Sequence, residues 1–117
     1  MILEVLDNYI SDYPNPIELT KGDTVQLGEE SDANGPYPDW VFCVCNRTGN
    51  KGWVAKSVLS MTGDIGSATE NYTSKEMNVK SGDKVDSLYE LNGWYWCIRI
   101  ADGVTGWVAK DNIKTEK

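Results

Sequence analysis

The chain contains one short unit twice, and this repetition limits the folds that it can adopt. Residues 52–56, Gly-Trp-Val-Ala-Lys, recur letter for letter at 106–110. In both copies a tryptophan and a cysteine precede this stretch at the same spacing, and an Asn-Tyr pair and a Gly-Asp pair lie further upstream. Landmarks repeated once in one order predict two small units rather than one larger fold. With only two copies, each unit must hold most of its own core.

The spacing of the landmarks predicts the unit boundaries. We expect a first unit over 1–60, a short linker over 61–67 and a second unit over 68–117. The linker is too short to separate the units by much more than a domain diameter. Units of this size bury only about 60% of the surface that their unfolded chains expose. Packing of one copy against the other would therefore stabilise both.

The charge balance narrows the class of partner. Among 117 residues there are 11 Lys and Arg against 18 Asp and Glu, with no histidine, which gives a net charge of −7. Such a chain lacks the basic surface that nucleic acid requires, and anionic membrane surfaces would repel it. The first residues carry no basic region before an apolar run, so we expect no signal peptide. We expect a cytoplasmic protein, or a cell-envelope protein if a signal sequence has been removed.

The residue types that carry catalysis are scarce. Without histidine there is no Ser-His or Cys-His nucleophile pair and no imidazole metal ligand. Cys43, Cys45 and Cys97 fall inside predicted strands, where thiols are inert. We expect these cysteines to be reduced, and we expect no enzyme activity, no metal and no cofactor.

The pattern along the chain is that of β-structure. Short runs of β-branched and aromatic residues alternate with turn sequences such as Thr-Gly-Asn, Asn-Gly and Asp-Gly. No segment has an apolar stripe of helical period and length. This spacing is typical of a small barrel or sandwich, so the expected fold class is all-β.

The ordered landmarks resemble those of the SH3 domain, twice over and along nearly the whole chain. They are an opening tyrosine, x-Leu-x-Φ-x-x-Gly-Asp, a Trp-x-x-small strand, Gly-aromatic-Val and a final aliphatic residue. The resemblance implies two partly open, five-stranded β-barrels in tandem, packed against each other. The pattern is similar to bacterial SH3-like domains, which serve as attachment or targeting modules, in some cases for cell wall.

The same resemblance implies two aromatic ligand grooves. In the first copy it points to Tyr9, Tyr13, Trp40 and Trp53, and in the second copy to Tyr72, Glu76, Trp94 and Trp107. Two further ring positions of the family are filled by Asp7 and Val58 in the first copy and by Glu70 and Asn112 in the second. About half of the stacking surface is thus missing from each copy, so we expect ordinary PxxP binding to be weak or absent.

The loops distinguish the two copies. The first loop of copy one is three residues longer, which predicts that copy one has the better groove. Copy one also carries an insertion over 28–39, and its segment Pro36-Tyr37-Pro38 would either cover the neighbouring groove or remain a solvated loop.

The tryptophan strands are apolar on both faces. The face opposite the expected core holds Phe42, Val44, Trp96, Ile98 and Ile100. Strands that are apolar on both faces are usually buried on both, so we expect these residues to pack copy against copy. The alternatives are self-association of the chain, or a bulge or the insertion covering this face.

These patterns together predict a non-catalytic binding or adaptor module. Its partner would be a peptide or protein, or alternatively a cell-wall glycopeptide. The competing hypotheses are a structural or assembly protein with occluded grooves and a bacterial cell-wall targeting module.

Overall fold

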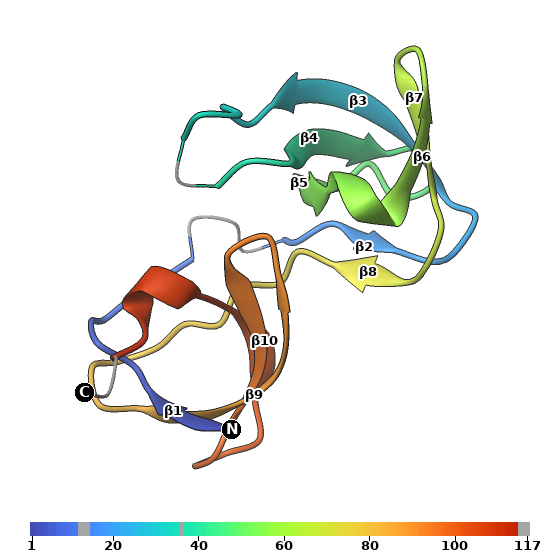
Figure 1. Ribbon diagram of the computed structural model, residues 1–117. Helices are drawn as coiled ribbons and strands as arrows, with labels where there is room; N and C mark the ends of the chain where they lie inside the picture. The colour runs from blue at the N-terminus through green and yellow to red at the C-terminus, as the bar shows by residue number, and fades with distance from the viewer. Residues whose placement is uncertain (12–14, 36, 115–117) are drawn as a thin grey trace. The chain divides into compact units, whose positions relative to one another are not determined.

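A computed structural model describes residues 1–11, 15–35 and 37–114 (Figure 1). Strands and two short 3-10 turns are the only regular elements of these described residues, so the all-β expectation is confirmed. The chain divides into two compact units, of which one is formed by both ends of the sequence and the other by the continuous segment between them. Unit 1 consists of Met1–Asp12 together with Glu76–Lys117, and unit 2 consists of Tyr13–Lys75.

Unit 2 contains a five-stranded antiparallel sheet with the order β5-β4-β3-β7-β6. Its strands are β3 (Thr24–Glu30), β4 (Trp40–Cys45), β5 (Lys51–Ala55), β6 (Leu59–Thr62) and β7 (Ile65–Ala68), with the 3-10 turn η1 (Lys56–Val58) before β6. A separate two-stranded pair joins β2 (Glu18–Leu19) to β8 (Tyr72–Thr73), which lie side by side in Figure 1.

Unit 1 contains a four-stranded sheet with the order β1-β9-β10-β11. Its strands are β1 (Ile2–Glu4), β9 (Lys84–Leu91), β10 (Trp94–Arg99) and β11 (Thr105–Ala109), followed by the 3-10 turn η2 (Lys110–Asn112). Three isolated bridges complete the pairing: Val5 with Ile113, Tyr9 with Val79, and Glu76 with Trp107.

The two repeats have exchanged their first strands. In unit 1, Leu3 of β1 lies opposite Val85 of β9; in unit 2, the same place opposite Val25 is taken by Gly66 of β7. The flanking backbone hydrogen bonds match as well. Val5 exchanges hydrogen bonds with Asp83 and Gly82, whereas Ala68 exchanges them with Asp23 and Gly22. Each barrel is therefore completed by the opening segment of the other repeat.

This exchange changes the predicted division of the chain at 1–60, 61–67 and 68–117. The segment expected to be a linker is a β-hairpin, in which β6 pairs with β7 from Leu59–Ala68 to Thr62–Ile65. Gly63 makes the turn with a φ of 59°, which glycine adopts without steric cost. The internal repeat identifies two equivalent opening segments, but it carries no information about which barrel each one completes.

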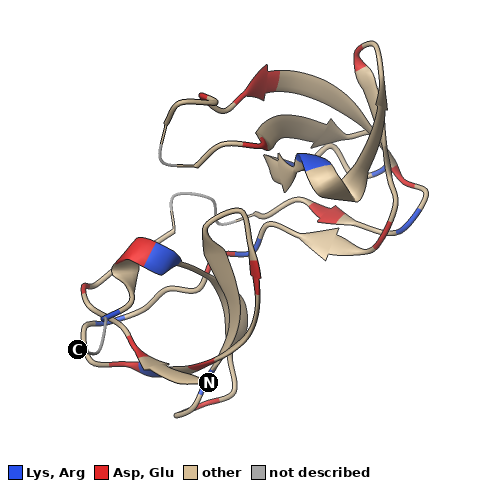
Figure 2. Cartoon of the chain, in the orientation of Figure 1, with Lys and Arg blue, Asp and Glu red and all other residues tan. Residues whose placement is uncertain are grey.

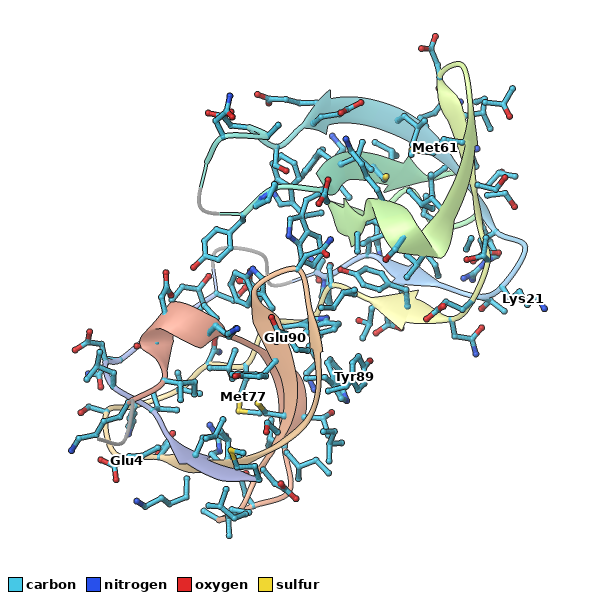
Figure 3. All side chains as sticks on the ribbon, in the orientation of Figure 1. Glu4, Lys21, Met61, Met77, Tyr89 and Glu90 are labelled. Carbon is cyan, nitrogen blue, oxygen red and sulfur yellow. The ribbon has the colours of Figure 1, made fainter. Side chains whose placement is uncertain are left out.

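The core of each unit follows the predicted alternation. In β4, Val41, Cys43 and Cys45 are buried while Phe42 and Val44 are only half-buried. In unit 1 the core forms a single cluster of buried residues: Val5, Met77, Val79, Val85, Cys97, Val108 and Ile113. Figure 3 shows Met77 inside this unit and Tyr89 projecting from its outer surface. Val5 belongs to this core, so the exchanged segment is an integral part of unit 1.

Candidate functional site

A tyrosine–glutamate pair lies where the two pieces of unit 1 meet. The Tyr9 hydroxyl donates a hydrogen bond of 2.7 Å to Oε1 of Glu76, and the Ser11 hydroxyl donates another of 2.9 Å to the same oxygen. The backbone of Tyr9 also exchanges hydrogen bonds with Val79 at 2.8 and 2.9 Å. The half-buried carboxylate of Glu76 is therefore oriented by side chains from the exchanged segment.

Glu76 is also fixed from its own side of the chain. It forms a parallel bridge with Trp107, and the next amide, that of Met77, donates 3.0 Å to the Trp107 carbonyl. This close approach requires Gly106, because a Cβ there would lie 2.8 Å from the Met77 nitrogen and 3.0 Å from its Cα. The repeated Gly-Trp sequence thus positions Glu76 beside β11.

Trp94 and Tyr95 begin β10 in the same unit, and both are half-buried. Trp94 lies opposite Ala109 in β11 and opposite Leu91 in β9. The Tyr95 ring packs against the core, and the Lys110 ammonium lies 5.9 Å from its centroid. Both rings retain surface for contact with another molecule.

Asp7 and Asn112 stand at two positions where the SH3 family carries groove tyrosines, and they bind each other. The Asp7 amide donates 2.9 Å to Oδ1 of Asn112, and Nδ2 of Asn112 donates 3.0 Å to the Asp7 carbonyl. The Leu6 amide adds a bond of 2.8 Å to the Asn112 carbonyl. Two polar residues that bond to each other therefore occupy positions at which the family carries rings of its proline pocket.

Unit 2 presents less aromatic surface at the equivalent places. Trp40 is only 7% exposed and Tyr72 only 9%. The Tyr72 hydroxyl donates 3.0 Å to the carbonyl of Trp53, which is half-buried. Asp39, just before Trp40, has a φ of 70°, an unusual conformation for a residue other than glycine.

The structure regroups the predicted groove residues. Tyr9 lies in unit 1 with Glu76, Trp94 and Trp107, whereas Tyr72 lies in unit 2 with Trp40 and Trp53. The first loop of copy one includes residues outside the described part of the chain, so the prediction that copy one has the better groove stays a prediction. Tyr13 and Pro36 lie outside the described residues, so their predicted roles in a groove and in its covering stay predictions. Tyr37 is half-buried.

Two of the apolar residues expected to pack copy against copy, Phe42 and Trp96, have aromatic partners within their own units. Phe42 meets Trp53 edge to face at 5.4 Å, and Trp96 meets Trp107 at 5.2 Å; both are direct cross-strand pairs. The Tyr89 ring also meets the Trp107 ring edge to face, with centroids 5.7 Å apart. Val44 and Ile98 are half-buried, and Ile100 is 54% exposed. Packing of one copy on the other through these residues stays a prediction.

The three thiols differ in acidity: although burial opposes it, hydrogen bonds with Thr48 and Arg47 lower the pKa of Cys45 below its ordinary value. All three cysteines are free and buried, and burial raises the pKa of the Cys43 and Cys97 thiols to about 11. Among the described residues, no group of three or more His, Cys, Asp or Glu side chains could hold a metal ion. Figure 2 shows acidic and basic residues interspersed in both units, and eight ion pairs are described, including Arg47–Asp23 and Arg99–Asp102.

Residues 4–61 match the family model of the variant SH3 domain. This stretch belongs to the SH3-like family. The match covers the first repeat as it runs in sequence, so it includes the segment that the structure places in unit 1. A search of curated proteins gave no match. In the described part of the chain, no helix is long and apolar enough to span a membrane.

SH3-like domains are, in general, non-catalytic modules that bind peptide or protein ligands. This chain carries such a domain, with its surface rings and its oriented carboxylate gathered in unit 1. The signal for the exchange that assembles them lies in the small residues Gly66 and Ala68, which stand where the first repeat has Leu3 and Val5. Gly66 and Ala68 fill less volume than Leu3 and Val5 at these two core positions.

Proposed function

We propose that the protein is a binding module that recognises a peptide or protein partner through the unit 1 surface formed by Tyr9, Glu76 and Trp94, without ordinary PxxP recognition. The observation that carries this proposal is the mutual hydrogen bonding of Asp7 and Asn112. Proline-rich ligands dock in grooves lined by aromatic rings. A polar pair at two of these ring positions removes part of the surface on which proline rings would stack.

The remaining features favour a mixed polar and aromatic ligand. Trp94 offers ring surface, and Glu76 offers an acceptor oriented by two hydroxyl groups. Tyrosine and tryptophan combine a large apolar area with few rotatable bonds, so they contribute strongly at protein interfaces. Unit 2 contributes less, since Trp40 and Tyr72 are mostly buried.

An NMR titration of the 15N-labelled chain tests the proposal. Three sets of ligands are compared: PxxP peptides, proline-free peptides with aromatic and cationic residues, and muropeptides. We expect shifts around Trp94 and Glu76 with proline-free peptides, lost in Trp94→Ala and retained in Tyr89→Ala, whose ring lies on the outer surface of the same unit. Tight PxxP binding, or shifts confined to unit 2, would contradict the proposal.

Burial of Trp40 and Tyr72 favours a second candidate for unit 2, a structural role with its groove aromatics used for packing. In that case no ligand set would shift the unit 2 resonances, while Trp40→Ala would lower the stability of the protein. Muropeptide binding in the same titration would instead support a cell-wall targeting module.

A further inference from the structure

The segment Met1–Asp12 is bound to unit 1 as a separate peptide would be. It precedes the whole of unit 2 in the chain, yet its backbone hydrogen bonds run to residues 79–114. Four such backbone bonds, of 2.8–2.9 Å, join Glu4 to Lys114, Val5 to Asp83, Leu6 to Asn112 and Tyr9 to Val79. A single covalent connection, at residues 12–13, joins this strand to unit 2.

The strand and its site are complementary in charge. The terminal ammonium of Met1 lies 2.8 Å from Asp86, and the Glu4 carboxylate pairs with Lys84 at 2.5 Å and with Lys114 at 3.6 Å. The Lys84 and Lys114 cations lower the pKa of Glu4. These pairs add to the apolar contacts of Leu3 and Val5 with the unit 1 core.

The other opening segment cannot take this place. A Cβ on Gly66 would lie 3.1 Å from a methyl group of Leu27 and 3.1 Å from one of Val25, so a larger residue there would force these side chains to shift. Unit 1 has Leu3 at the equivalent position and Val5, 1% exposed, where unit 2 has Ala68. Placing Leu3 in unit 2 would cause overlap, and placing Gly66 and Ala68 in unit 1 would leave cavities, both of which are destabilising.

We propose that Met1–Asp12 is an exchangeable strand and that a second copy of this chain can supply it to unit 1, giving a reciprocally exchanged dimer. The contacts of the strand are the same whether it comes from its own chain or from another. Only the covalent connection through unit 2 favours the monomer, because it raises the effective concentration of the chain's own strand at unit 1. Exchange of identical elements between copies is a low-cost route to dimers.

The exchange would give each unit 1 a composite surface. Tyr9 and Ser11 of one chain would orient Glu76 of the other, so the candidate binding surface would contain residues of both copies. The hairpin β6–β7 cannot exchange in the same way, because β7 is joined to β6 through the turn at Gly63 within unit 2. Exchange is thereby confined to one of the two equivalent strands.

Mixed single-cysteine chains test the proposal in the full-length protein. Glu4 and Lys84 are register partners in β1 and β9. Chains carrying Glu4→Cys are mixed with chains carrying Lys84→Cys, refolded together at concentrations from 10 μM to about 1 mM, oxidised, and analysed by non-reducing electrophoresis and peptide mass spectrometry. We expect a disulfide between positions 4 and 84 whose yield rises with the concentration during refolding.

Chains carrying Ser60→Cys and Ser67→Cys, register partners within the hairpin, are the matched control and should give no such rise. A 4–84 yield no higher than the 60–67 yield at every concentration would overturn the proposal. Adding Leu3→Gly to the Glu4→Cys chain should lower the yield at least fivefold. Because the readout is a cross-link, it is independent of whether unit 1 binds a peptide.

Discussion

Trp107 shows how a predicted ligand contact becomes a packing residue. It is 4% exposed, and its ring makes edge-to-face contacts with the rings of Trp96 and Tyr89. Such aromatic pairs contribute about 0.5–1.5 kcal/mol beyond the burial of area. The aromatic row stabilises the outer face of the unit 1 sheet, whereas Trp94 is half-buried.

Trp96→Ala should lower the free energy of unfolding by roughly 2–3 kcal/mol. Removing a fully buried tryptophan typically costs about 3–5 kcal/mol. The expected loss is smaller here because Trp96 is half-buried. Urea unfolding followed by circular dichroism measures the change. Tyr89→Ala, which removes a ring that is 55% exposed, is the control and should cost no more than about 1 kcal/mol. Equal effects of the two substitutions would show that Trp96 has no special packing role.

Asp23 should make the stability of unit 2 dependent on pH. Hydrogen bonds from Arg47, as short as 2.8 Å, and one from the Thr20 amide lower the pKa of Asp23 from its ordinary value of 3.8. The folded protein therefore binds fewer protons than the unfolded chain near this pH, so the stabilisation is present above pH 3.8 and is lost as the pH falls through the folded pKa.

Asp23→Asn should consequently flatten the decline in stability as the pH falls below the ordinary value of 3.8. Thermal unfolding at a series of pH values measures this dependence, with Asp64→Asn in the β6–β7 turn as the control. An unchanged acid profile in Asp23→Asn would mean that the Arg47–Asp23 pair does not contribute.

Strand parity was predictable from residues such as Cys43 and Cys97, since only a small side chain fits at these core positions. The polar replacements Asp7 and Asn112 were also visible as departures from the family pattern. Their mutual hydrogen bonds were not, because those bonds depend on two segments more than a hundred positions apart. The sequence also grouped Tyr9 with the rings of the first repeat and Tyr72 with those of the second, whereas the structure places Tyr9 in unit 1 and Tyr72 in unit 2. Because the two repeats carry identical landmarks, the sequence does not determine which barrel each opening segment completes.

At the scale of elements, the contact between residue 76 and β11 depends on the absence of one side chain. A Cβ at Gly106 would meet the backbone of Met77, which is held by its hydrogen bond to Trp107. A Cβ at the equivalent Gly52 would instead meet the side chains of Ser74 and Ile17. Side chains can move more easily than a paired backbone.

Gly106→Ala should therefore destabilise the protein by roughly 2–3 kcal/mol, and more than Gly52→Ala does, since overpacking against backbone forces the strands apart. It should also shift the NMR signals of Tyr9 and Glu76, because their hydrogen bond depends on the position of residue 76. Chemical denaturation and 15N spectra of both variants check this. A smaller effect at Gly106 than at Gly52 would contradict the proposed close approach.

At the scale of the whole molecule, the exchange couples the first residues of the chain to the last strands. Buried thiols report on each unit separately, Cys97 in unit 1 and Cys43 in unit 2, and burial raises the pKa of both to about 11. Thiols with such pKa values react slowly with disulfide reagents until the surrounding structure opens.

Val5→Ala should accelerate the labelling of Cys97 roughly 30-fold, corresponding to a loss of about 2 kcal/mol from a buried site, and leave Cys43 largely unaffected. Ala68→Gly should instead accelerate the labelling of Cys43, to a smaller extent, and leave Cys97 largely unaffected. Stopped-flow labelling with site assignment by mass spectrometry gives both rates. Acceleration of Cys43 rather than Cys97 by Val5→Ala would show that the repeats fold without exchange.

The placement of Met1–Asp12 in unit 1 also determines the order in which the protein can fold during synthesis. The strand is made before unit 2, and its partners are made after it, separated by the 63 residues from Tyr13 to Lys75. At about 5–20 residues per second, a ribosome needs roughly 3–13 s to bridge that gap. Unit 2 can close while the chain is still growing, whereas β1 must wait unpaired until β9 and Ile113 have emerged.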